Sequence, residues 1–497
     1  MPFSEHFGNG VVKPFLVEGW KRVEDFNREA ASGAGMSHRS HVALQNFFVF
    51  NPTFGRCEDE EYKKLLFFYP PETNMDNQLR DMGIAQGLVN FTKIFSPDQP
   101  CEVLHTQKTR QIFLEAEPDY WLVFTLTLPS QQRTRDSQTV VEYLTEDVQD
   151  SVYQAVLRKL YTLFRCFQGT LTEIVTEKGV NGLRELLDTY FNVMLPRLKF
   201  QHCDILDIFQ GVHFLPLDKA AFLQVNSFVG SLEKTFPEIK FTAFLCNDQL
   251  VWSGLAQKDM QQLYHYLLGN ILQGAFEAEL LAPTLSISKG SSAVHSQARY
   301  LHGKTEDLKF LEELPRMLVG DKRYTLLIYR ALSATVCLLL EPNDLTIELA
   351  QRMEKYLAPE LTLLANDISK QYLKLTASVT RSNQEIICKY IYFNRMNIAQ
   401  KSSVHADRKL GFSVPLSLIR LITDLHVDLL MLGSDDEGPF DGEIIAKTSD
   451  DWWLVAKTWD YREFFVVLNQ KNASLIQISD EVRRLSNSQL QNIFFID

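Results

Sequence analysis

The sequence has few cysteines, and none of their spacings is typical of a disulfide framework or a zinc site. Seven cysteines are scattered over 497 residues, and no two of them form a C-x-x-C pair. An odd, scattered set of this kind is typical of free thiols in a reducing compartment. We therefore expect a cytoplasmic protein that has no structural disulfides and binds no metal.

Long hydrophobic runs and an excess of positive charge are also missing. No apolar run approaches the roughly 18 residues that a membrane span needs, and the N-terminus lacks the pattern of a secretory signal. The formal net charge is −12, whereas a general nucleic-acid binder carries positive charge to replace phosphate counterions. These absences argue against a membrane-spanning, secreted or nucleic-acid-binding protein.

Motifs of catalysis are missing as well. The chain has no G-x-S-x-G elbow, and the motif Gly303-Lys304-Thr305 lacks the earlier glycine of a phosphate-binding loop, because Ala298 stands there. No nucleophile, base and orienting group can be named together. We therefore expect no catalytic residues, no covalent catalysis and no cofactor. A hydrolase with an unrecognised site is the least favoured alternative.

The chain does contain enough apolar residues for several cores. Apolar residues make up 45 % of it and aromatic residues 11 %. Because a domain holds roughly 150 residues, the length suggests about three domains.

One stretch, residues 239–268, shows the organisation of such a domain. Residues 241–246 predict a buried strand, Asn247-Asp248 a tight turn, and Leu250 and Trp252 one face of a second strand. From Met260 onward the apolar residues recur at helical spacing. We expect three such units and an α+β fold, in which each domain is a small, mainly antiparallel sheet flanked by layers of helices.

The predicted boundaries place a flexible N-terminal extension at 1–40 and domains at 41–200, 201–376 and 377–497. In the first domain we expect strands at 44–50, 64–69, 103–114 and 120–128, helices at 76–95 and from 145, and a polar loop after 128. In the second we expect, outside the stretch above, a strand at 205–215, helices at 219–236, 345–356 and 359–372, and a buried strand within 324–340. In the third we expect strands at 386–393, 452–459 and 463–469, helices at 415–432 and from 480, and an acidic loop through Glu443.

Two basic clusters have both a structural and a functional interpretation. The first is Arg80, Lys93, His105, Lys108 and Arg110, which is either a solvated face or a docking surface for an acidic or phosphate-bearing partner. The second is Lys389, Arg395, Lys401, Arg408 and Lys409. It is either a solvated loop or a site for anionic lipid headgroups, where each residue would contribute about 1 kcal/mol.

Several short phrases identify a family resemblance. They are LHTQK at 104–108, FLPLDK at 214–219, NDQL at 247–250, IYFN at 391–394, LNQKNA at 468–473 and NIFFID at 492–497. In these phrases the chain resembles the vacuolar fusion protein family named for calcium, caffeine and zinc sensitivity. The resemblance covers about 43–497 and does not extend to the first 40 residues or to the loop near 283–315.

The resemblance implies three longin-type domains and an obligate complex with a second tri-longin protein, the monensin-sensitivity subunit. It implies that the pair is the guanine nucleotide exchange factor of a late-endosomal Rab GTPase of the Rab-seven type, with a third, scaffolding subunit in animals. Such a complex is recruited peripherally to the anionic surface of endosomal membranes. It promotes early-to-late endosome maturation and fusion with lysosomes and autophagosomes.

In that family the paired first longin domains form the Rab platform. The resemblance therefore places partner and Rab contacts near 44–50 and 76–95, with these candidate residues: Asn51, Phe54, Thr92, Lys93, Phe95, His105 and Lys108. Each has a structural alternative; Phe95, for example, is also a plausible core residue at a helix end. The alternative function is a trafficking adaptor or tethering scaffold without exchange activity.

Overall fold

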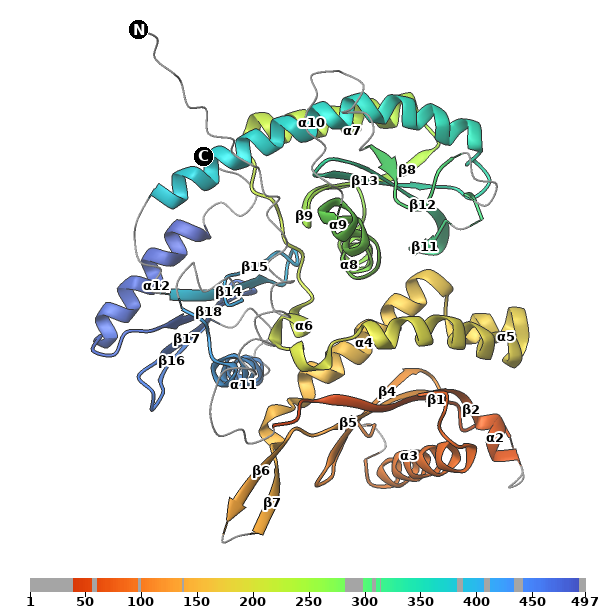
Figure 1. The fold of residues 1–497 in the computed structure, drawn as a ribbon, viewed down its shortest axis with the longest axis vertical. Coiled ribbons are helices and arrows are strands. Elements are labelled where there is room, and N and C mark those ends of the chain that lie inside the picture. The colour runs from red at the N-terminus through yellow and green to blue at the C-terminus, as the bar shows by residue number, and fades with distance from the viewer. Residues whose placement is uncertain are drawn as a thin grey trace.

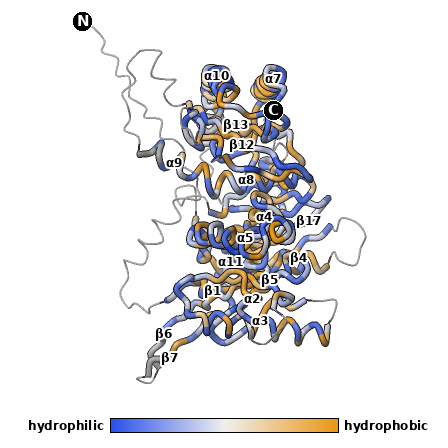
Figure 2. The backbone as a smooth tube through the Cα atoms, turned by 90° about the vertical axis from the view of Figure 1, so that its right-hand side faces the viewer, coloured by the Kyte–Doolittle hydropathy of each residue, from blue (hydrophilic) through white to orange (hydrophobic). Residues whose placement is uncertain are grey.

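The computed structural model describes residues 39–55, 60–96, 100–135, 138–281, 298–305, 310–312, 314–381, 388–405, 412–432 and 441–490. These residues form three main antiparallel sheets, each with helices on both faces (Figure 1). Each sheet, together with its helices, is one domain, and we number the domains one, two and three in chain order. Figure 2 shows the helices α7 and α10 of domain two at one end of the molecule and α3 of domain one near the opposite end.

Domain one contains a five-stranded sheet in the order β2-β1-β5-β4-β3. Its elements are β1 (Ala43–Phe50), α2 (Glu61–Lys64), β2 (Leu65–Tyr69), α3 (Met75–Phe95), β3 (Val103–His105), β4 (Thr109–Glu117), β5 (Tyr120–Thr127), α4 (Asp150–Gln168) and α5 (Leu171–Met194). The inner strand β1 is apolar on both faces from Phe47 to Phe50, as a strand between two helical layers must be. Phe48 and Phe50 pack under α3, whereas Phe47 and Val49 pack under α4 and α5.

Domain two repeats this plan after helix α7 (Lys219–Thr235). Its elements are β8 (Ile239–Cys246), β9 (Gln249–Ser253), α8 (Gln257–Tyr266), α9 (Leu272–Leu281), β10 (Arg299–Tyr300), β11 (Arg316–Val319), β12 (Lys322–Ala331), β13 (Ala334–Leu340) and α10 (Ile347–Arg381). The strand order is β10-β12-β13-β8-β9, and β11 also pairs with β12.

Domain three has the strand order β15-β14-β18-β17-β16. Its elements are β14 (Cys388–Asn394), β15 (Gln400–Ser402), α11 (Leu416–Leu432), β16 (Gly442–Lys447), β17 (Trp453–Trp459), β18 (Arg462–Leu468) and α12 (Leu475–Gln489). In all three domains a hairpin is followed by one helix, and we call α3, α8 and α11 the leading helices. We call the edge strands β2, β9 and β15 the first edges, and β3, β11 and β16 the far edges.

The segment between domains one and two differs from the strand predicted at 205–215. Residues Ile205–Phe209 form helix α6 instead, because Asp204 and Asp207 make a reciprocal capping box at its start. In the rest of this segment, Val212 makes a parallel β-bridge to Ala399 of domain three, and Phe214 makes one to Leu250 of domain two. The predicted strand is therefore wrong for its first half and reduced to two bridges in its second.

Three other sequence predictions need correction. Leu250 and Trp252 do not share a face, because a bulge at Val251 turns them toward opposite apolar clusters of domain two. The predicted polar loop after residue 128 forms a hairpin, β6 (Ser130–Arg135) with β7 (Gln138–Tyr143). The acidic loop ends before Gly442, so Glu443 lies in β16.

Helix boundaries also differ from those predicted. Helix α10 continues through Pro359 instead of dividing there, and the flanking Leu357 and Leu361 are fully buried. The free energy gained by packing these buried leucines exceeds the cost of the backbone hydrogen bond that proline removes. Helix α12 begins at Leu475, before the predicted start at Asp480, because Ser474 and Gln477 form a capping box.

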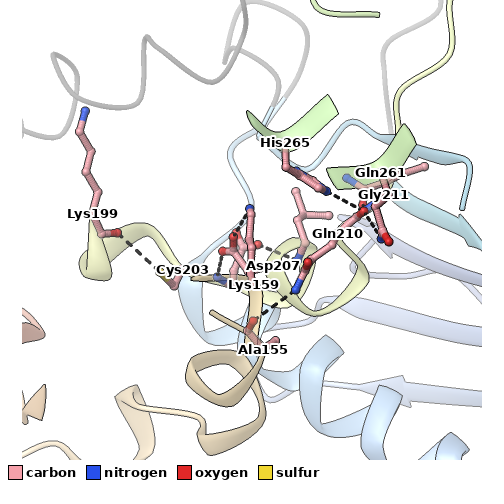
Figure 3. A network of polar contacts seen from close by, with 12 residues as sticks. Ala155, Lys159, Lys199, Cys203, Asp207, Gln210, Gly211, Gln261 and His265 are labelled. Carbon is pink, nitrogen blue, oxygen red and sulfur yellow. Dashed lines mark hydrogen bonds and ion pairs between the residues drawn. The ribbon is translucent and has the colours of Figure 1, made fainter. Parts of the chain in front are cut away.

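Residues Gln210 and Gly211 connect all three domains. The Gln210 side-chain amide donates to the carbonyl of Ala155 in α4 (3.2 Å), and its own carbonyl accepts from His265 Nε2 in α8 (2.8 Å), as Figure 3 shows. The next amide, Gly211 N, donates to Gln400 Oε1 at the first edge of domain three (3.1 Å). This short segment therefore holds the domains together through directional hydrogen bonds as well as apolar packing.

Candidate protein-interaction site

Helix α3 has two apolar faces, and only one of them packs against the sheet of domain one. The inner face buries Met82, Ala85 and Val89. The outer face carries four large apolar side chains that remain exposed: Ile84 (51 %), Phe91 (59 %), Ile94 (75 %) and Phe95 (71 %). Steps of three, four and seven residues place such side chains along one side of a helix. We call these four residues the α3 stripe; contiguous exposed apolar surface of this kind is typical of protein-binding sites.

Two glycines leave the helix backbone open beside the α3 stripe. Gly83 and Gly87 are both exposed, and a Cβ built on either would meet no atom within 4 Å. Because glycine is unfavourable inside a helix, these positions are not explained by the stability of α3 itself.

The C-terminal end of α3 combines aromatic and charged groups. The rings of Phe91 and Phe95 lie 4.9 Å apart. Lys93 Nζ lies 5.3 Å from the centre of the Trp121 ring and 3.8 Å from a carboxylate oxygen of Glu115. Lys93 and Phe95, both predicted contact residues, therefore lie at this exposed end.

Thr92 has an intrahelical role. Its hydroxyl donates to the carbonyls of Leu88 (3.0 Å) and Val89 (3.1 Å). A side chain bonded back to its own helix in this way satisfies its donor locally. The neighbouring Phe91 and Ile94 are the better exposed apolar groups of this helical turn.

Asn51 and Phe54 lie in the loop after β1 and contribute to its structure. Asn51 is 2 % exposed, and its Oδ1 accepts from Thr53 N (2.9 Å) and Thr53 Oγ1 (2.6 Å). Phe54 is half-buried and packs edge-to-face on Tyr120 at 6.0 Å. Asn51 thus fixes the turn, as asparagine commonly does through its own side chain.

His105 and Lys108 lie on the β3–β4 hairpin, at the far edge of the same sheet. His105 Nε2 lies 2.7 Å from Asp150 Oδ2 at the start of α4, and Arg110 Nε lies 3.3 Å from the other oxygen of that carboxylate. Lys108 is exposed in the turn. The predicted basic docking surface is therefore incomplete, because Arg110 is only 6 % exposed and faces α4.

The predicted lipid-binding set does not form a basic surface in the described residues. Lys389 is 1 % exposed inside the sheet of domain three, so the prediction that it meets lipid headgroups is wrong. Arg395 pairs with Glu463 (2.6 Å), and Lys401 Nζ donates to the Gln489 carbonyl (3.1 Å). Arg408 and Lys409 lie outside the described residues.

Groups with strongly shifted pKa values are buried and structural. Burial raises the pKa of Cys166 to about 12 and that of Cys246 to about 11. Burial, together with the charge of Lys159, lowers the pKa of His265 to about 3, so its ring is neutral and donates to Gln210. In the part of the chain that the structure describes, no three metal-ligating side chains gather at one point.

The sequence prediction missed most of the α3 stripe. Of its four residues only Phe95 is a predicted contact residue, although Ile84, Leu88, Phe91 and Phe95 follow helical spacing in the sequence. This second apolar row beside Met82, Ala85 and Val89 was an available signal of a helix with two contact faces.

No helix within the described ranges has both the length and the apolarity to cross a bilayer.

Three family models match the chain, one for each domain. The model described as "First Longin domain of INTU, CCZ1 and HPS4" matches residues 44–169, which include the α3 stripe. "Intu longin-like domain 2" matches 239–364, and "Intu longin-like domain 3" matches 385–485. The three longin-like domains expected from the resemblance are confirmed.

Curated relatives match almost the whole chain. A vacuolar fusion protein CCZ1 homolog of Nematostella vectensis is 40 % identical over 464 residues, covering 91 % of this chain and 98 % of the relative. One of Xenopus laevis is 36 % identical and covers 93 % and 99 %. One of Dictyostelium discoideum is 27 % identical and covers 91 % and 98 %.

Proposed function

The chain belongs to the vacuolar fusion protein CCZ1 family, and on that premise we propose that it is one subunit of a heteromeric guanine nucleotide exchange factor for a late-endosomal Rab GTPase of the Rab-seven type. Its partner is a second tri-longin protein, the monensin-sensitivity subunit, and a third, scaffolding subunit can join them. The complex acts from the cytoplasm on endosomal membranes, to which it is recruited peripherally. It promotes endosome maturation and fusion with lysosomes and autophagosomes.

The α3 stripe is the observation that carries this proposal. Phe91, Ile94 and Phe95 are each more than half exposed on the outer face of a helix whose inner face is already packed. Fully burying a large apolar side chain stabilises an assembly by about 1.5–3 kcal/mol. When a permanent partner covers several such groups in one row, their burial adds up to a large favourable free energy of association.

Exchange by such a complex needs no nucleophile or base in this chain. A factor that binds the nucleotide-free GTPase more tightly than the nucleotide-bound form must, by linkage, weaken nucleotide affinity by the same factor. This difference in affinity comes from contacts that fit only one arrangement of the GTPase switch loops. In this chain the exposed end of α3, with Lys93 and Phe95, and the β3–β4 turn with His105 and Lys108 are the groups that we propose for contacts with the partner and the GTPase.

The direct test is release of fluorescent GDP from the purified Rab GTPase. We expect release to accelerate with the chain and its partner together, and to stay near the intrinsic rate with either alone. Full exchange by the single chain would contradict a shared platform. A complex that forms and leaves the release rate unchanged would favour the alternative, a trafficking adaptor or tether.

The contribution of the α3 stripe is tested by the double variant Phe91→Asp/Phe95→Asp. We expect its affinity for the partner to fall at least tenfold, because hot-spot aromatics commonly contribute more than 1.4 kcal/mol each. The matched control is Leu223→Asp/Leu363→Asp, which changes two exposed leucines (61 % and 64 %) on α7 and α10 of domain two. Equal affinity of both variants for the partner would overturn the role of the stripe.

A further inference from the structure

In domain one, a helix covers the sheet face opposite the leading helix as far as the turn between the last two strands. We call this part of a sheet its hairpin end. It is formed here by Glu117 of β4 and Tyr120 of β5, and Tyr120 is only 5 % exposed. The Glu117 carboxylate accepts from the first amides of α5, Leu171 N (2.5 Å) and Thr172 N (3.0 Å). The start of α5 therefore closes the hairpin end of domain one.

In domain two the long helix α10 closes the hairpin end. The last pair before the turn is Ala331 with Ala334, and both residues are fully buried in the apolar cluster under α7 and α10. Beside them, the hydroxyl oxygens of Ser333 in the turn and Ser369 in the second half of α10 lie 3.1 Å apart. A covered hairpin end is thus common to these two longin-like domains, although different helices provide the cover.

The hairpin end of domain three is partly open. Figure 1 shows α12 on the side of this sheet that faces away from α11, where Ile478 and Val482 pack on the strands. The hairpin end on that face is the pair Trp459 and Arg462, and both residues are only partly buried. Beside it is a surface recess of about 560 Å³, lined by Asp441, Gly442, Glu443, Lys457, Thr458 and Trp459.

Aromatic rings make this hairpin end apolar. Trp459 packs edge-on against Phe464, with ring centres 6.3 Å apart, and its ring centre lies 6.5 Å from that of Tyr392. Phe464 and Tyr392 are buried beneath it. Part of Trp459 is left uncovered by the described residues, and burial of an aromatic ring is strongly favourable.

The chain leaves α12 at one end of a row of side chains that leads to these rings. Lys401 of β15 donates through Nζ to the Gln489 carbonyl at the end of α12 (3.1 Å). Across the strands, Lys401 pairs with Tyr392 of β14, Tyr392 with Phe464 of β18, and Phe464 with Lys457 of β17. Because neighbouring strands are about 4.8 Å apart and an extended residue spans about 3.3 Å, roughly five residues cross from β15 to β17.

We propose that the C-terminal segment 491–497, which lies outside the described residues, packs along this row and covers the hairpin end of domain three. Its sequence, QNIFFID, follows α12 directly and has four consecutive apolar residues, Ile493 to Ile496. Alternate side chains of an extended segment share a face, so one aromatic and one aliphatic side chain meet the rings in either register. Attachment beside the site gives the segment an effective concentration on the order of millimolar, which favours it over a separate chain.

Photo-crosslinking in the full chain tests the location of the segment. The photoreactive amino acid p-benzoylphenylalanine replaces Phe494, which keeps an aromatic ring there, and crosslinked peptides are mapped by mass spectrometry. We expect crosslinks to residues 457–464. The same group at Leu475, which is 57 % exposed at the opposite end of α12, is the control and should give no crosslink to 457–464. Crosslinks from position 494 that all lie outside the sheet of domain three would overturn the inference.

Two double variants measure what the segment contributes. We expect Phe494→Ser/Phe495→Ser to accelerate hydrogen exchange of the β17–β18 amides at least tenfold, because Trp459 loses its cover. Leu475→Ser/Ile476→Ser changes two apolar residues that are exposed (57 % and 75 %) at the start of α12, and it should exchange like the unmodified chain.

Unchanged exchange in Phe494→Ser/Phe495→Ser would overturn the inference. If this variant also bound the partner subunit more weakly, the segment would be a partner contact instead. Should the variant fail to fold, the crosslinking of the full chain still decides the question. Both measurements concern domain three alone, so their outcome is independent of nucleotide exchange.

Discussion

At the residue scale, Glu463 shows how a buried charge is kept in domain three. The carboxylate is 2 % exposed and accepts from His426 Nδ1 (2.5 Å) and Arg395 Nε (2.8 Å). Burial by itself would raise the pKa of Glu463, but the hydrogen bond and charge of His426, with Arg395, outweigh burial and lower the pKa below its usual value. Folding therefore favours the ionised form of the Glu463 carboxylate.

We expect Glu463→Gln to lower the free energy of unfolding of domain three by about 3 kcal/mol at pH 7, because His426 and Arg395 bond to different oxygens of the buried carboxylate and an amide has only one acceptor oxygen and no charge. Since the folded pKa is lowered, this stabilisation is complete above the unfolded pKa of 4.5 and is lost as the pH falls through the folded pKa. Urea unfolding with hydrogen exchange of β14 and β18 amides measures it from pH 7 to pH 3.

The control for this series is Glu360→Gln on the exposed side of α10, which should match the unmodified chain at every pH. A stability difference for Glu463→Gln that stays constant down to pH 3 would contradict the assignment of an ionised carboxylate.

A second prediction concerns Gly211. A Cβ at this position would lie 2.3 Å from the Gln400 Cβ, whereas a Cβ at Gly230 in α7 would meet nothing within 4 Å. We expect Gly211→Ala to destabilise the chain by about 1–3 kcal/mol through overpacking. Gly230→Ala should stabilise it by roughly 0.5–1 kcal/mol, because alanine loses less backbone entropy in a helix. Calorimetric unfolding gives both values, and the same sign for both would contradict the close packing at Gly211.

At the element scale, helix α3 differs from the other leading helices in its exposed outer face. Helix α8 contacts α4, and α11 contacts α6, so both have neighbours from elsewhere in the chain. Helix α3 has its main contacts with its own sheet and leaves Ile84 and Phe91 exposed. Its glycines therefore reduce the stability of the isolated helix without compensating contacts inside this chain.

We expect Gly83→Ala/Gly87→Ala to stabilise α3 in the isolated chain by about 1–2 kcal/mol, since neither Cβ meets an atom. Hydrogen exchange of the α3 amides measures this change. Gly179→Ala is the contrasting variant, because its φ of +72° is strained for alanine, and it should destabilise α5. Faster exchange in the α3 variant would contradict the open environment of these glycines.

At the scale of the whole molecule, residues 212–215 join the sheets of domains two and three into one continuous hydrogen-bonded layer. Alternate peptide groups of this segment point to β9 on one side and to the start of β15 on the other. Domain one is attached to the same segment through Gln210 and α4. The relative position of the domains is thus set by a linker that belongs to all of them.

We expect Val212→Pro to uncouple domain three, because proline removes the N–H that bonds the Ile398 carbonyl. Scanning calorimetry should then show a separate transition for domain three, and limited proteolysis should cleave near residue 212. Val212→Ala keeps this N–H and should retain the unmodified pattern of transitions. A single unchanged transition in the proline variant would show that other contacts suffice to couple the domains.

The sequence by itself determined the repeated unit, because the alternation of strands and helices is set by local apolar spacing. It predicted the hairpin at 241–253 and the helix at 76–95, and the family resemblance drew attention to Phe95 and Lys93. The boundaries at 200 and 376 stay predictions, since they cut a region where one segment serves several domains.

Only the tertiary structure decided which apolar residues remain exposed. Phe91 and Phe164 are equally apolar in sequence, yet Phe91 is 59 % exposed and Phe164 is fully buried. Likewise, Lys389 has the charge of a surface residue but lies inside a sheet. Local spacing fixes which face of an element a side chain occupies, whereas its burial depends on what distant parts of the chain pack against that face.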